Sequence, residues 1–114
     1  MEWGFDLTDF KSAESFKNLL RRHKLASGYK RVYQGKDQWK YYGWQRMYHY
    51  TWSRKGLKLI TGNNPLTKGR QLNKGYASYI GIKGRDKDVK ALAMDIKKTA
   101  RYIKGESPGK RDFI

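Results

Sequence analysis

The 114-residue chain contains no cysteine and only two prolines. Without cysteine, a disulfide scaffold, a thiolate metal site and a cysteine nucleophile are all excluded. No apolar run approaches the roughly 20 residues that a membrane span needs, and residues 1–6 lack the basic and apolar regions of a signal peptide. The length suits one domain, placed here over residues 1–114, and we expect it in the cytoplasm with no membrane partner.

Acidic residues are scarce. The chain has 10 of them against 26 lysines and arginines, which gives a formal net charge of +16. The imbalance is concentrated in residues 29–85, where Asp37 is the one acid beside 13 basic residues. A long stretch of like charge repels itself and gains nothing in folding, so it predicts a polyanionic partner. A generally basic, soluble surface is the alternative.

Hydrophobic periodicity predicts two amphipathic helices and several strands. The first helix is expected between a cap at Ser12 and Ser27-Gly28, and the second between a cap at Asp86 and about Lys104. Strands are expected over residues 3–8, 29–33, 39–54, 57–61 and 76–83, with a turn at 34–37. The pattern predicts an α+β two-layer sandwich, an antiparallel sheet with both helices on one face.

Residues 39–54 carry the strongest functional pattern. Their even positions hold only aromatic and basic side chains, namely Lys40, Tyr42, Trp44, Arg46, Tyr48, Tyr50, Trp52 and Arg54. Alternate strand positions share a face. Rings that stack on bases beside cations that contact phosphates form a surface for nucleic acid. Some of these rings are also expected in the core, because Tyr and Trp pack well across strands.

Residues 62–75 form the second candidate, a long loop without an acid. We expect Lys68, Arg70 and Lys74 to close over a bound strand as a basic flap, and an ordinary hairpin loop is the alternative. The run Lys74-Gly75-Tyr76-Ala77 resembles the opening of the RNA-recognition-motif signature, although Ser78 and Gly81 stand where aromatics belong. The predicted site is completed by Lys55, Lys58, Tyr76, Lys83 and Arg85.

These patterns favour a non-enzymatic nucleic-acid-binding protein, with RNA or a single strand preferred, and with no metal and no cofactor. Asp37 alone in the basic middle does not supply the carboxylate cluster of a metal-dependent nuclease. Two alternatives remain open. One is an interaction or inhibitor protein that docks an acidic protein surface. The other is a metal-free ribonuclease with His49 as general base.

Overall fold

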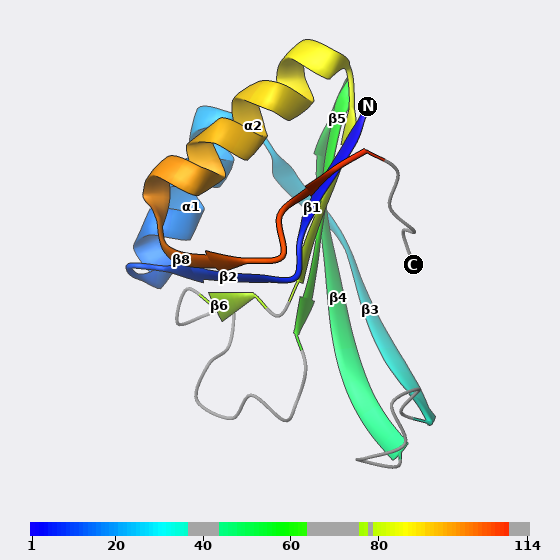
Figure 1. The fold of residues 1–114 in the computed structure, drawn as a ribbon. Coiled ribbons are helices and arrows are strands. Elements are labelled where there is room, and N and C mark those ends of the chain that lie inside the picture. Colours follow the sequence, from blue (N-terminus) through cyan, green and yellow to red (C-terminus); the bar gives the residue numbers. More distant parts are fainter. Residues whose placement is uncertain (37–43, 64–75, 78, 110–114) are drawn as a thin grey trace.

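The computed structural model describes residues 1–36, 44–63, 76–77 and 79–109, and side chains at 1–26, 50–62 and 79–109 (Figure 1). The elements in chain order are β1 (Glu2–Phe5), β2 (Leu7–Phe10), α1 (Ala13–Arg22), β3 (Ala26–Lys36), β4 (Trp44–Arg54), β5 (Leu57–Asn63), β6 (Tyr76–Ala77), β7 (Tyr79–Gly84), α2 (Asp86–Thr99), β8 (Ala100–Lys104) and β9 (Ser107–Pro108). The predicted α+β class is confirmed.

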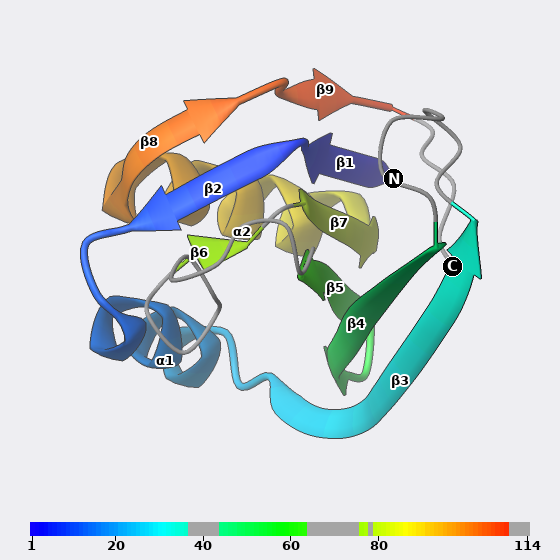
Figure 2. The ribbon, with the colours of Figure 1, turned by 90° about the horizontal axis from the view of Figure 1, so that it is seen from below.

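The strands form two antiparallel sheets where one was expected. The larger, six-stranded sheet has the order β3-β4-β5-β7-β1-β9, and the smaller, three-stranded sheet has the order β6-β2-β8. The strands β6, β2 and β8 of the smaller sheet follow the same order as β7, β1 and β9 of the larger sheet. Each strand of the smaller sheet is also next in the chain to the corresponding strand of the larger one, β6 to β7, β2 to β1 and β8 to β9. The two sheets therefore behave as one sheet bent at a corner (Figure 1), and Figure 2 shows β1 running into β2 and β8 into β9.

The corner depends on Asp6 and Gly105. Asp6 separates β1 from β2, and its backbone N–H donates to the carbonyl oxygen of Lys104 at 3.0 Å. Gly105 follows β8 with φ at +69°, and a Cβ there would collide with the Asp6 carboxylate. Glycine is the residue that adopts this conformation without steric cost. The sequence therefore places Gly105 where the chain turns between two strands.

Helix α1 begins as predicted and ends earlier. Ser12 caps it by accepting a hydrogen bond from the Ser15 N–H, and Phe16, Leu19 and Leu20 are buried. The helix stops at Arg22 because the Leu25 N–H bonds the Leu20 carbonyl and the Lys24 N–H bonds the Arg21 carbonyl. This pair of bonds is the Schellman motif, which requires a left-handed residue. Lys24 supplies it with φ at +57°, so the predicted end at Ser27-Gly28 is wrong.

Helix α2 is also shorter than expected. Arg85 is its N-cap residue and makes no side-chain capping bond, while Asp86 is the first helical residue. Val89, Leu92, Ala93 and Ile96 are buried as the spacing predicted. The helix ends at Thr99, and residues 100–104 pair with β2 as strand β8. The predicted extension to Lys104 is wrong because Ile103 packs on the core from a strand that hydrogen-bonds β2.

The remaining strands differ from prediction at their ends. Strand β3 runs to Lys36 through the expected turn at 34–37, because Gln34 and Lys36 pair with β4. Strand β5 extends to Asn63. The predicted strand 76–83 is divided between β6 and β7, which belong to different sheets. Residues 39–43 lie outside the described part of the chain.

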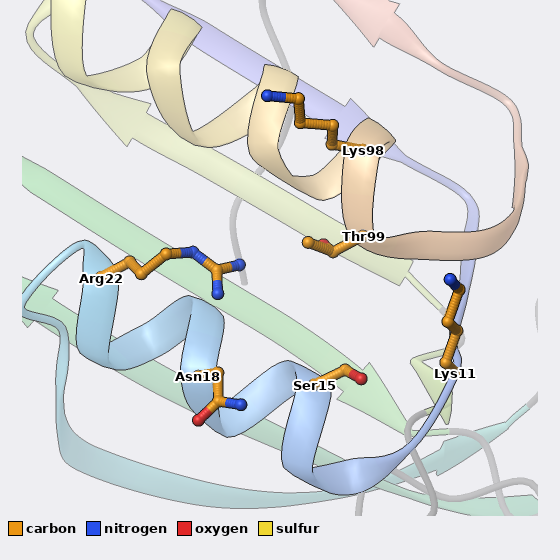
Figure 3. A pocket seen from close by; sticks show the side chains of 6 residues that line it. All are labelled: Lys11, Ser15, Asn18, Arg22, Lys98 and Thr99. Carbon is orange, nitrogen blue, oxygen red and sulfur yellow. The ribbon is translucent and has the colours of Figure 1, made fainter.

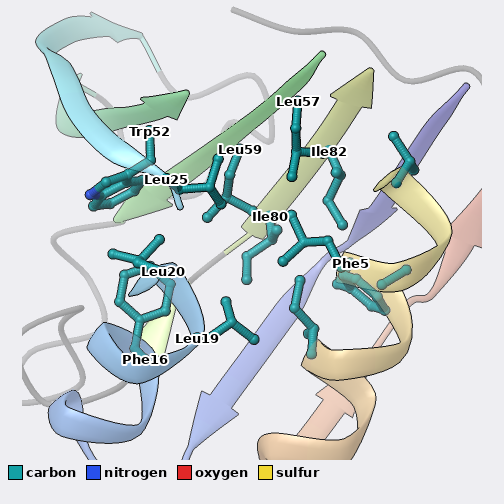
Figure 4. Packing of buried hydrophobic residues seen from close by; sticks show 14 of the residues in the cluster. Phe5, Phe16, Leu19, Leu20, Leu25, Trp52, Leu57, Leu59, Ile80 and Ile82 are labelled. Carbon is teal, nitrogen blue, oxygen red and sulfur yellow. The ribbon is translucent and has the colours of Figure 1, made fainter. Parts of the chain in front are cut away.

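The core lies where both helices meet the strands (Figure 4). Its largest fully buried side chains include Phe5, Leu19, Leu59, Ile82 and Leu92. Burying apolar surface is the main favourable contribution to folding, at about 25 cal/mol per Å². The same cluster contains Trp52 from β4.

Polar contacts join α1, α2 and β4 beside this core. Arg22 donates from Nε and Nη2 to the two carboxylate oxygens of Asp95 at 3.0 and 3.1 Å, and His23 Nε2 lies 2.7 Å from Oδ2. Partial burial raises the pKa of Asp95. Hydrogen bonds and positive charge from Arg22 and His23 outweigh burial, so that pKa lies below its ordinary value. Arg54 donates to the His23 carbonyl at 2.7 Å and pairs with Asp88 at 3.3 Å.

Replacing Lys24 with glycine should stabilise the protein. A left-handed conformation costs an L-residue about 1–2 kcal/mol, while glycine loses more entropy on folding, so we expect a net gain of about 0.5–1 kcal/mol. Chemical denaturation of Lys24→Gly measures this gain. Lys17→Gly, inside α1, is the control and should instead destabilise by about 1 kcal/mol. Loss of stability in Lys24→Gly would contradict the assigned helix end.

Removing the charge of Asp95 should give a pH-dependent loss of stability. Because the folded-state pKa is lowered, the contribution of Asp95 is complete at neutral pH and is lost as the pH falls below about 4. Asp95→Asn should lose about 1–2 kcal/mol at pH 7, with the difference from the parent shrinking toward pH 3. Thermal unfolding between pH 2.5 and 7 measures it. The exposed pair Glu14–Arg21 provides the control Glu14→Gln, expected to change little. A pH-independent difference would refute the assignment.

Candidate nucleic-acid interface

Strands β3 and β4 form a two-stranded ribbon, here called the β3–β4 ribbon (residues 26–36 and 44–54). Its pairing runs from Ala26 opposite Ser53 to Lys36 opposite Trp44. Strand β5 pairs with residues 48–54 of β4. In the described part of the chain, positions 44–47 therefore pair with β3 alone. Figure 1 shows the ribbon extending away from the helices.

The β3–β4 ribbon carries no acidic residue along either strand. Its basic residues are Lys30, Arg31, Lys36, Arg46 and Arg54. Register places Lys36 opposite Trp44 and Gln34 opposite Arg46, so these positions share one face. The predicted site omitted the β3 positions, although the aromatic residues of Tyr29–Tyr33 had already predicted a strand there. The side chains of Trp44, Arg46 and Tyr48 lie outside the described residues.

Trp52 is a core residue. Its relative exposure is 8 %, and its ring lies 5.3 Å from the Phe16 ring in an edge-on arrangement. Tyr50 is half-buried and stacks on Trp52 at 5.8 Å. The interpretation of Trp52 as a base-stacking ring is therefore corrected, because the ring is buried and already packs against Phe16 and Tyr50. At the body of the protein, the even positions of β4 lie on the side of the core.

Arg54 is likewise engaged within the protein. Its guanidinium donates to the carbonyl oxygens of His23 and Lys55 and pairs with Asp88. These contacts occupy Nε, Nη1 and Nη2 and fix the start of the turn before β5. Arg54 therefore holds β4 against both helices, and we do not carry it into the proposed binding surface.

The predicted cations Lys58 on β5 and Lys83 on β7 lie on the face of the larger sheet that is turned away from the core. Register places Lys58 directly opposite Lys83, with Ser53 of β4 next to Lys58 and Glu2 of β1 next to Lys83 in the same row. Leu57, Leu59, Ile80 and Ile82, at the neighbouring positions, are buried, whereas Lys58 and Lys83 are exposed. Like charges that lie directly opposite in a sheet are destabilising. Glu2 offsets part of this repulsion through an ion pair with Lys83 at 3.8 Å.

Two more predicted cations lie at the adjoining end of β5 and β7. Lys55 occupies the turn that leads into β5, where Gly56 has φ at +82°. The Arg85 N–H donates to the Gly56 carbonyl at 2.9 Å, and the Arg85 side chain passes next to Gly56. Both side chains are exposed. We call Lys55, Lys58, Lys83 and Arg85 together the β5–β7 cations.

Seven acidic side chains among the described residues are paired with cations. Ion pairs within 4.0 Å involve Glu2, Asp9, Glu14, Asp86, Asp88, Asp95 and Glu106. Their partners lie on the helices, β4, β7, β8 and the N-terminal amine. The body therefore uses these carboxylates for internal contacts, and two of their partners, Arg54 and Lys83, belong to the basic stretch 29–85.

Several predicted residues cannot be placed. Lys40, Tyr42, Lys68, Arg70 and Lys74 lie outside the described part of the chain, and the proposed flap falls there with them. Tyr76 is in β6, where its backbone pairs with Asp9. The backbone of His49 pairs with Arg31 and Gly62. Side chains at both positions are outside the described residues.

No protein-family model matches the chain, and no curated protein or solved structure shows significant similarity to it. Within the described ranges, no helix has the length and apolar character needed to cross a bilayer. Over the same residues, histidines and carboxylates do not gather into a group of three that would hold a metal ion.

Truncating Trp52 tests its assignment to the core. Trp52→Ala removes a ring packed on Phe16 and Tyr50 and should cost about 3–5 kcal/mol of unfolding free energy. Denaturant unfolding followed by circular dichroism gives this value. Met94→Ala is the control at a 58 % exposed position of α2, where a change within about 0.5 kcal/mol is expected. An equally small loss of unfolding free energy in Trp52→Ala would contradict the core assignment and favour a base-stacking role for this ring.

Proposed function

We propose that the protein binds nucleic acid without catalysing a reaction, with RNA or a single strand preferred. The observation that carries this proposal is the acid-free β3–β4 ribbon, part of which pairs with no other described strand. A two-stranded ribbon that extends beyond β5 offers a nucleic-acid backbone positions that pair with no other described strand. Basic residues along it neutralise phosphates and release counterions, which supplies sequence-independent affinity.

The β5–β7 cations support the same proposal. Lys58 and Lys83 face each other across two strands at a cost in folding. Bringing an anionic backbone across this face would relieve the repulsion, so the arrangement favours the bound state over the free state. Because Lys58 has no carboxylate opposite it on β4 or β7, it is the clearest phosphate-contacting residue among the four.

Aromatic residues of the β3–β4 ribbon add base stacking, which favours binding of unpaired bases. Trp44 and Tyr48 occupy alternate positions of β4 with Arg46 between them. Stacking of a base on an aromatic ring contributes about 1–3 kcal/mol and does not depend on sequence. With Trp52 assigned to the core, we place the stacking contribution on positions 44 and 48 and expect broad sequence tolerance.

Binding should be strongly dependent on salt. With five to eight phosphate contacts, the log–log slope of affinity against salt should be about −4 to −7. Lys58→Gln should reduce the slope by about one unit and leave folding stability equal or higher, since it removes like-charge repulsion. Fluorescence anisotropy with labelled single- and double-stranded RNA and DNA at several salt concentrations measures both quantities. Lys90→Gln, exposed on α2, is the matched control.

Other outcomes identify the alternatives. Absence of binding to all four nucleic acids at low salt would refute the proposal and favour an acidic protein partner. Cleavage of the RNA on a denaturing gel, abolished by His49→Ala, would identify a metal-free ribonuclease instead. An unchanged slope in Lys58→Gln would remove the β5–β7 cations from the interface while leaving the ribbon to be tested by Arg46→Gln.

A further inference from the structure

A separate cationic pocket lies between α1 and the C-terminal end of α2 (Figure 3). Its volume is about 240 Å³, room for several water molecules at about 30 Å³ each. The lining side chains are all polar and none is acidic: Lys11, Ser15, Asn18, Arg22, Lys98 and Thr99. None of these residues belongs to the ribbon or to the β5–β7 cations.

The hydrogen bonds around the pocket leave donors available to a ligand. Arg22 uses Nε and Nη2 for Asp95, which leaves the hydrogens of Nη1. Asn18 accepts from Arg21 through Oδ1 at 2.7 Å, so its amide nitrogen retains two donors. The Thr99 hydroxyl is not a free donor, because it donates to the Asp95 carbonyl oxygen at 2.7 Å, so Thr99 only lines the pocket. The free donors of Arg22 and Asn18 suit a ligand that accepts several hydrogen bonds.

The charge around the pocket is positive. Asp95 offsets Arg22, which leaves Lys11 and Lys98 as the uncompensated charges of the lining. A lysine in the last turn of a helix is common because it offsets the helix dipole, so Lys98 alone indicates little. Lys11, however, precedes α1 and comes from a distant part of the sequence. Folding brings both lysines into the lining of one pocket with Arg22, and an anion is the ligand that this combination suits.

We propose that this pocket binds a phosphate group, supplied either as free phosphate or by the end or backbone of a nucleic acid. Phosphate oxygens accept many hydrogen bonds, and Arg and Lys are their usual partners. The negative end of the α2 dipole also lies here. Side chains must therefore supply the affinity, which makes Lys11 and Lys98 decisive. This proposal does not rest on nucleic-acid binding, because free phosphate satisfies the same donors.

Titration of the full chain with inorganic phosphate at constant ionic strength, held with chloride, tests the site. Amide chemical shifts in a ¹H–¹⁵N spectrum should change saturably at Ser15, Asn18 and Thr99. Lys11→Gln and Lys98→Gln should each weaken phosphate binding by about threefold to tenfold, as expected for charge-assisted contacts at an open site. The double variant should show no saturation. Lys90→Gln, exposed on α2 away from the pocket lining, should bind like the parent.

Comparison with an oligonucleotide distinguishes the two phosphate sources. If the pocket holds a nucleic-acid phosphate, inorganic phosphate will compete with the oligonucleotide and the double variant will weaken its binding. If the ligand is free phosphate, oligonucleotide affinity will not change in the double variant. Non-saturating shifts, or equal binding by the parent and the double variant, would overturn the proposal. Either result leaves the proposed function untouched, because the phosphate titration contains no nucleic acid.

Discussion

Asp95 links the two helices through its ion pair with Arg22 and its contact with His23, beside the apolar core that both helices share. Asp95 belongs to α2, and its two partners are at the end of α1, with nitrogen–oxygen distances of 2.7–3.1 Å. Arg54 extends the same group of contacts to β4 through the His23 carbonyl and Asp88. The Schellman turn at Lys24 ends α1 beside these contacts, and β3 begins two residues later at Ala26.

The same contacts explain how a chain of net charge +16 folds. Carboxylates of the body are placed against cations of the helices and nearby strands, so the regions that pack are locally balanced. Exposed cations outside these ion pairs are left beside β5 and β7, at Lys55, Lys58 and Arg85, and in the α1–α2 pocket, at Lys11 and Lys98. Separation of this kind keeps repulsion away from the core and presents positive charge at surfaces where an anion can approach.

Burial divides the aromatic residues that one sequence pattern had grouped. Trp52 and Tyr50 lie where β4 crosses the body and pack with Phe16. Positions 44 and 46 belong to the same alternation but lie beyond the pairing with β5. A single strand therefore serves the core at one end and the candidate interface at the other. Alternation identifies which positions share a face, but whether the face is covered depends on what packs against it.

Local chemistry in the sequence determined the α+β class, the Ser12 cap and the buried faces of both helices. Each of these depends on residues close in the chain, through strand and helix periodicity or capping. Tertiary structure decided the rest. Residues 100–104 continue the apolar spacing of α2, yet they form β8 because β2 lies beside them. Lys58 and Lys83 meet, and Lys11 joins Lys98, only through strand register and helix packing, which join positions far apart in sequence and which no local pattern encodes.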